Sequence, residues 1–256
     1  MAMSPSGPPP VLPSAQHIRH AKCWELLWGL PVSNNVKVFG VRLLHAALPC
    51  RALVAGMRPQ PATYVACPAC ASRLPSRRDV PPETYTHLFL ECPTSRPAVV
   101  WLLDLWLHLT GVRPPLTAEV IVAADMEAWP DGPTGPQLEA WHSLRLILLF
   151  QIWAARCEVG QAPRSPSTLV RATIAAVAAE IRLQFARSRE REVLLRELPT
   201  HVLAIQHLRP AGDGLATWQS SGLCQVLGGG GGTSVGRQHL LVLLSDTSPV
   251  PLPPDP

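Results

Sequence analysis

Four residues in the first half of the chain combine types and a spacing that could bind a metal ion. Cys67 and Cys70 form a Cys-x2-Cys pair, and His87 and Cys92 follow sixteen residues later as a His-x4-Cys pair. Three thiolates and one imidazole complete a tetrahedral shell for zinc and leave no position for a catalytic water. The sequence therefore predicts Zn²⁺ as the cofactor of a structural site, in a binding module rather than an enzyme.

The spacing of the second pair constrains the local backbone. Five residues along an α-helix correspond to about 500°, so His87 and Cys92 would not share a helix face. The helix predicted over 83–90 must therefore end just before Cys92, and Pro93 cannot continue it. One alternative is a degenerate copy of the site that no longer folds around metal.

Three features of the sequence indicate the cellular compartment: the number of cysteines, the N-terminal residues and the hydropathy. Seven cysteines are an odd number, four of them are scattered singly, and residues 1–14 lack a secretory signal. No disulfide framework is expected, and a reducing compartment favours metal binding by the close pair. No apolar run reaches the roughly 18 residues of a membrane span. We expect an intracellular protein, nuclear or cytoplasmic, that is not secreted and has no membrane partner.

Positive charge is concentrated around the predicted metal site. Residues 16–96 hold ten Lys and Arg against four Asp and Glu, whereas the whole chain has a net charge of +4. A basic module of this size suits a polyanion, so RNA or DNA is the expected partner. An ordinary solvated surface is the alternative for any one of these cations. Six arginines of this region are the candidate phosphate contacts: Arg42, Arg51, Arg58, Arg73, Arg77 and Arg78.

Catalytic signatures are absent from the sequence. It contains no Asp-Asp pair of the kind that holds the two metal ions of a polymerase. The five glycines Gly228–Gly232 lack the following Lys-Ser/Thr of a phosphate-binding loop and are typical of a flexible linker. We therefore predict that the chain is not an enzyme.

Hydrophobic periodicity predicts a mostly α fold. Helices are expected over 16–30, 34–47, 83–90, 99–109, 138–157 and 167–191. We expect five regions: a disordered stretch over 1–14, a zinc-binding module over 16–110, a Pro-rich linker over 111–137, a helical region over 138–208, and a disordered Gly/Pro-rich tail over 209–256.

The metal-binding region resembles a known family. The lead-in Trp28-Gly29-Leu30-Pro31-Val32, the segment Arg42-Leu43-Leu44-His45-Ala46-Ala47-Leu48-Pro49, and the motif Glu83-Thr84-x-x-His87-Leu88-Phe89-x-x-Cys92-Pro93 are similar to the zinc-binding domain downstream of the reverse transcriptase in non-LTR (LINE-like) retrotransposons. The resemblance covers roughly 24–106, and more weakly 138–157, where Ile152-Trp153-x-x-Arg156 resembles a motif that often closes such polyproteins.

The resemblance implies a function as well as an origin. It implies a nuclear module that helps a reverse transcriptase hold template RNA or target DNA. Because this chain lacks the polymerase, a reverse transcriptase on another chain is a possible partner. Two alternatives remain: a structural or protein-interaction zinc domain with the helices of 138–191 as its partner surface, and a decayed retroelement fragment with no selected activity.

Overall fold

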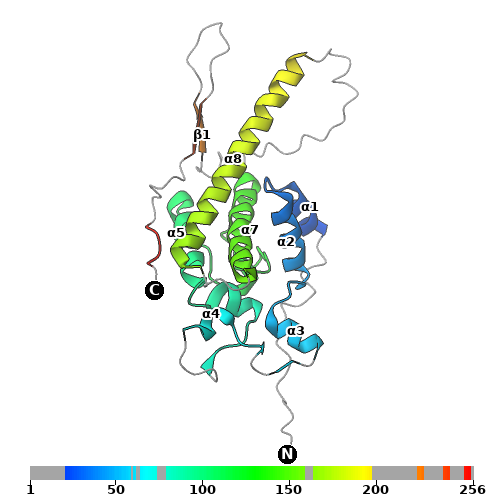
Figure 1. Ribbon diagram of the computed structural model, residues 1–256. Helices are drawn as coiled ribbons and strands as arrows, with labels where there is room; N and C mark the ends of the chain where they lie inside the picture. The colour runs from blue at the N-terminus through cyan, green and yellow to red at the C-terminus, as the bar shows by residue number, and fades with distance from the viewer. Residues whose placement is uncertain are drawn as a thin grey trace, which may run out of the picture.

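The computed structural model describes residues 21–58, 60–61, 64–73, 79–158, 164–197, 224–227, 239–242 and 251–254, and the fold over these residues is mostly helical, as the sequence predicts (Figure 1). The stretch 1–14, most of 209–256, Arg77 and Arg78 lie outside the described residues. The predictions made for those positions therefore stay predictions.

The helices follow one another along the chain with short connections. They are α1 (Ala21–Gly29), α2 (Asn34–Leu44), α3 (Arg51–Met57), α4 (Pro68–Ala71), the π-helical turn η4 (His87–Glu91), α5 (Arg96–Thr110), α6 (Ala118–Ile121), α7 (Gly135–Cys157) and α8 (Pro166–Glu197). Two short strands, β1 (Cys224–Leu227) and β2 (His239–Val242), pair antiparallel within the region predicted as a tail.

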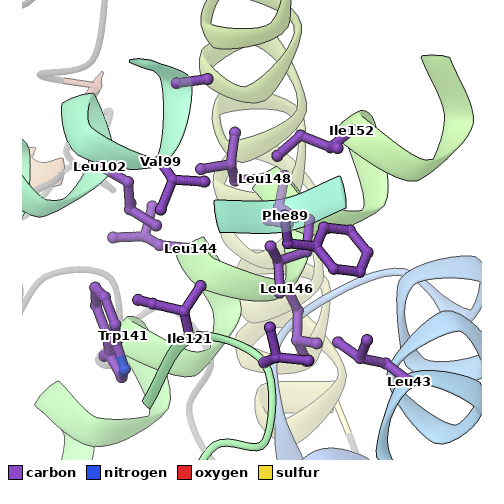
Figure 2. Close-up of a cluster of buried hydrophobic side chains, with 14 of the residues drawn as sticks. Leu43, Phe89, Val99, Leu102, Ile121, Trp141, Leu144, Leu146, Leu148 and Ile152 are labelled. Atoms are coloured by element: carbon purple, nitrogen blue, oxygen red, sulfur yellow. The ribbon is translucent and has the colours of Figure 1, made fainter. Parts of the chain in front are cut away.

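Helix α7 occupies the centre of the molecule, with α5 and α8 on one side and α1 and α2 on the other (Figure 1). Its apolar residues fall on every face, which is the pattern of a helix surrounded by protein. The run from Ala140 to Leu149 is buried throughout. Figure 2 shows side chains from α2, η4, α5 and α7 meeting in this core, among them Leu43, Phe89 and Val99.

The segment 111–137, predicted as a linker, packs into this core instead of running between two separate units. Val120 and Ile121 of α6 are fully buried, and Trp129 is 4% exposed. The Trp129 ring meets the ring of Trp141 edge to face at 5.4 Å between centroids. Arg145 donates a hydrogen bond to the Ile121 carbonyl at 2.7 Å. One continuous hydrophobic cluster therefore joins the two predicted regions 16–110 and 138–208.

A membrane span is not found among the described helices, since none combines the length and the apolar character that crossing a bilayer requires.

Replacing Trp129 by Ala tests whether the segment 111–137 belongs to the core. Removal of a buried indole should lower the free energy of unfolding by about 3–5 kcal/mol, because the transfer and cavity terms add. Trp28, which is 53% exposed, is the matched control, and Trp28→Ala should change stability by less than about 0.5 kcal/mol. Chemical denaturation measures both values. Equal, small effects would mean that 111–137 does behave as a linker.

Candidate metal centre

The first ligand pair lies at the start of α4. Cys67 is the residue before the helix. Pro68 occupies the first helical position, where the φ angle that the proline ring fixes is already that of a helix. The Cys67 carbonyl accepts a hydrogen bond from the Ala71 N–H at 2.9 Å, and the Cys70 carbonyl accepts one from the Arg73 N–H at 3.0 Å. This tight turn brings the two thiol groups to the same side of the backbone.

The second ligand pair is aligned by a π-helical turn. The Cys92 N–H donates to the His87 carbonyl at 2.7 Å, a hydrogen bond between residues five apart. Such a bond widens the helical turn. It brings Cys92 back over His87, which an α-helix would not do. The helix does end before Cys92, as the sequence predicts, but the π-turn itself was not predicted. Thr84 begins the segment, since its hydroxyl accepts a hydrogen bond from the His87 N–H at 3.0 Å.

A short antiparallel contact holds the two pairs together. The Cys67 N–H donates to the Pro81 carbonyl at 2.9 Å, and the Glu83 N–H donates to the Val65 carbonyl at 2.8 Å. Ala66 and Pro82 form the bridge between these bonds. The backbone just before the first pair therefore lies beside the backbone just before the second.

The four ligand atoms converge as the spacing predicts. They all lie within 4.8 Å of one another, and all four residues are buried. Cys67 Sγ and Cys92 Sγ are 4.0 Å apart, Cys70 Sγ and Cys92 Sγ are 3.9 Å apart, and Cys70 Sγ lies 3.4 Å from His87 Nε2.

These separations fit a tetrahedral metal ion. Bonds of about 2.3 Å to sulfur and 2.0–2.1 Å to nitrogen give edges of about 3.8 Å between sulfurs and 3.6 Å between sulfur and nitrogen. A disulfide would need about 2.05 Å between sulfurs, and all three cysteines are free. Cys67, Cys70, His87 and Cys92 could therefore coordinate a metal ion.

The orientation of His87 suits a ligand. Its Nε2 faces the sulfur of Cys70, and its Nδ1 lies 3.8 Å from the Glu91 carboxylate. A carboxylate behind the ring favours the tautomer that carries its proton on Nδ1, which leaves the Nε2 lone pair for a metal.

Electrostatics of the cluster also favour a cation. Burial raises the pKa of the Cys70 thiol to about 11. The pKa of Cys67 is raised, first by the hydrogen bond that it donates to Cys92 and then by burial. Accepting that hydrogen bond lowers the pKa of Cys92, and His87 lowers it further. At neutral pH the cluster alone would hold two protons on Cys67 and Cys70. A metal ion must displace both, so its affinity rises with pH.

Glu83 connects the ligand-bearing segment to the core. Its side chain is fully buried. The carboxylate accepts two hydrogen bonds from Arg156, at 3.0 Å from Nε and 2.7 Å from Nη2, and a third from the Arg51 N–H at 2.9 Å. Arg156 lies in the last turn of α7, and the hydrogen bonds to Glu83 raise the pKa of its guanidinium. This two-pronged geometry is the strong form of an Arg–carboxylate pair.

Glu83 and Arg156 lie in separate sequence motifs, and no spacing pattern pairs them. Both residues belong to the segments that carry the family resemblance, 73 positions apart. The structure joins those segments through one ion pair. Two charges of opposite sign, each next to an apolar run of the sequence, were the signal that could have suggested the contact.

The predicted phosphate-binding arginines have different environments. Arg42, Arg58 and Arg73 are exposed. Arg51 is half-buried, donates to the Ala66 carbonyl at 3.1 Å and lies over the Tyr64 ring, so its guanidinium holds the protein itself together. Arg77 and Arg78 are outside the described residues.

A cavity of about 460 Å³ lies beside the cluster of three cysteines and one histidine, between this cluster, the end of α7 and the start of α8. Cys67 and Cys92 line one wall, and Arg156 and Arg164 line another. Each arginine is paired with a carboxylate, Arg156 with Glu83 and Arg164 with Glu158. The cavity walls therefore carry no net positive charge, and they do not form a phosphate site.

Replacing Glu83 by Ala tests the connection between site and core. It would leave the Arg156 charge without its partner and should lower the free energy of unfolding by about 3–5 kcal/mol. Asp104, whose ion pair with Arg113 is solvent-exposed, is the matched control, and Asp104→Ala should cost less than about 1 kcal/mol. Denaturation of the metal-loaded protein measures both. Similar losses of stability in the two variants would show that the Glu83–Arg156 pair does not join the ligand-bearing segment to the core.

Comparisons with known proteins add no identification. No protein-family model, curated protein or solved structure matches this chain. The geometry itself therefore carries the conclusion that the chain holds a buried cluster of three cysteines and one histidine that could bind a metal ion.

Proposed function

We propose that this chain is a zinc-stabilised module that binds nucleic acid. The observation that carries the zinc assignment is the buried set of three thiols and one imidazole with nearly tetrahedral separations. Sulfur-rich tetrahedral sites select zinc among the common divalent ions. Four protein ligands leave no position for water or substrate, so the ion would be structural and the chain would not be a metalloenzyme.

The contacts around the site support a structural role. The ligands of a structural zinc come together only in the folded chain, so the free energy of zinc binding adds to the free energy of folding. Here the ligand-bearing hairpin is joined to α7 by Glu83 and Arg156 and to α3 by the Arg51 N–H. Metal binding would therefore stabilise the helical core as well as the hairpin.

Nucleic-acid binding is supported by the distribution of charge. Arg42, Arg58 and Arg73 are exposed, and none of them forms an ion pair with a carboxylate within the described residues. Exposed, unneutralised arginines around a small module provide the electrostatic part of binding to a phosphate backbone. RNA and DNA both offer that backbone.

An origin in a LINE-like retrotransposon is the finer form of this proposal. It rests on the resemblance of the segments 24–106 and 138–157. The Glu83–Arg156 pair supports it, because it makes these two segments one structural unit. In that setting, a reverse transcriptase on another chain would be the partner and the nucleus the place of action.

The structure bears on the alternative of a protein-interaction domain. That alternative assigns the helices of 138–191 as the partner surface. The middle of helix α7, from Ala140 to Leu149, is buried on all sides, and the apolar residues of α8 that include Leu169, Val170 and Val177 pack in the same core. Over the side chains that the structure describes, up to residue 184, Leu183 is the exposed large apolar residue of these helices. This small apolar surface favours the nucleic-acid proposal.

Metal analysis tests the zinc assignment. Purified protein should contain about one zinc ion per chain. Cys70→Ser should lose the ion and unfold the ligand-bearing hairpin, because structural zinc contributes on the order of 10 kcal/mol to folding. Cys157→Ser, which changes an exposed cysteine outside the cluster, should retain both. Hydrogen exchange over residues 64–95 reports the unfolding. Folded wild-type protein without metal would refute the proposal and would agree with a degenerate site.

Fluorescence anisotropy with labelled oligonucleotides tests the nucleic-acid assignment. Binding should weaken by roughly tenfold or more between 50 and 200 mM salt, since a few neutralised phosphates give a logarithmic slope of about −2. Single-stranded RNA, single-stranded DNA and duplexes should be compared with the zinc-loaded protein. If none of them shows salt-sensitive binding, the interaction-domain alternative replaces this one.

A further inference from the structure

Two ring-bearing side chains are exposed on the outside of α1 and α2: Trp28 of α1, and His45 just past the end of α2. Trp24 of α1 is partly buried against the core. Trp28 of α1 is 53% exposed, although Trp101, Trp106, Trp129 and Trp141 are all buried. A single exposed apolar side chain is ordinary on a protein surface. Trp28 is informative because of the other side chains that share its surface.

Two contacts define how α1 and α2 lie against each other (Figure 1). The Lys37 ammonium donates to the Trp28 carbonyl at 2.7 Å, near the start of α2. The Trp24 ring lies 5.0 Å from the His45 ring, just past the end of α2. Because Trp24 and Trp28 are four residues apart on α1, they lie on the same side of that helix.

The outward face of α2 continues this surface. Val38, Arg42 and His45 follow one another at four- and three-residue steps and are all exposed. They lie opposite the buried stripe that includes Val36, Phe39 and Leu43. From residue 38 to residue 45 the surface extends for about 10 Å along the helix axis.

This surface is also basic. In sequence, residues 21–45 contain three cations, Lys22, Lys37 and Arg42, against the single carboxylate of Glu25. The exposed Arg42 has no carboxylate partner within the described residues. Arg42 thus differs from Arg156 and Arg164 beside the cavity, which are both neutralised, and it brings available positive charge to the α1–α2 surface.

We propose that the outer face of α1 and α2, formed by Trp24, Trp28, Arg42 and His45, is a stacking platform for unpaired nucleotides. Aromatic rings stack on bases of any sequence, and neighbouring cations contact the phosphates between those bases. At 3.4 Å per stacked base, a surface about 10 Å long holds two or three nucleotides. The occupant is single-stranded RNA or DNA. This inference rests on the proposed function and places the unpaired bases on α1 and α2.

Binding of unstructured 20-nucleotide oligomers, oligo(U) and oligo(dT), to the full zinc-loaded chain tests this platform. Trp28→Ala should weaken binding of both by about tenfold, since one stacking contact is lost. Arg42→Gln should reduce the logarithmic salt slope by about 0.7, the contribution of one phosphate on a single strand. The matched controls are Leu183→Ala and Arg171→Gln, which change an exposed apolar residue and an exposed arginine of α8 and should leave binding as in the wild type.

Circular dichroism and the zinc content confirm that each variant is folded. If the wild type binds with salt sensitivity but Trp28→Ala and Arg42→Gln bind as tightly as the controls, the platform is wrong and the proposed function stands. If duplex binding falls as much as single-strand binding in Trp28→Ala, stacking of unpaired bases is refuted. If the wild type binds no nucleic acid, the proposed function and the platform both fail. A difference between oligo(U) and oligo(dT) identifies which strand the surface prefers.

Discussion

The burial of the Glu83 carboxylate is the constraint on which the arrangement of the other elements depends. A carboxylate without water is costly unless charge and hydrogen bonds replace the solvent. Arg156 supplies the charge from the end of α7, and the start of α3 supplies a backbone N–H. Three segments distant in sequence must therefore meet at one carboxylate. The hairpin that carries the metal ligands is fixed to the core by this requirement.

Two buried centres among the described residues can carry negative charge: Glu83, and the cluster of Cys67, Cys70, His87 and Cys92. They are close along the chain, since His87 follows Glu83 by four residues. Each needs its own cation. Glu83 has Arg156. The cluster, whose second ligand pair begins at His87, has three thiols. Without a metal ion, the hydrogen bond to Cys92 and burial raise the pKa of Cys67, and burial raises the pKa of Cys70, so both stay protonated at neutral pH. Zinc is the cation that would allow all three to ionise. The same hairpin would then be held on one side by an ion pair and on the other by coordination bonds.

Local patterns in the sequence predicted what depends on local geometry. The ligand set follows from two short spacings, and most helices follow from periodicity and from prolines such as Pro31 and Pro49. Features that depend on tertiary contacts, or on the choice between competing local hydrogen bonds, were not predictable in this way. The π-turn needs the His87–Cys92 hydrogen bond, which competes with ordinary α-helical bonds. Trp129 lies in a Pro-rich segment whose composition is typical of a linker, so its burial in the core could not be predicted from the sequence pattern. The Glu83–Arg156 pair spans 73 residues, and no periodicity connects them.

The hairpin that brings the two ligand pairs together limits where such a module can gain or lose residues. Its base is closed by backbone bonds from Cys67 to Pro81 and from Glu83 to Val65. Val80 packs against the three cysteines, but residues 71–79 supply none of the four ligand atoms. Doubling the length of a flexible loop costs only about 0.6 kcal/mol in closure entropy. Insertions between residues 73 and 80 should thus be compatible with an intact metal cluster, whereas a single deletion between His87 and Cys92 would turn one ligand away from the others.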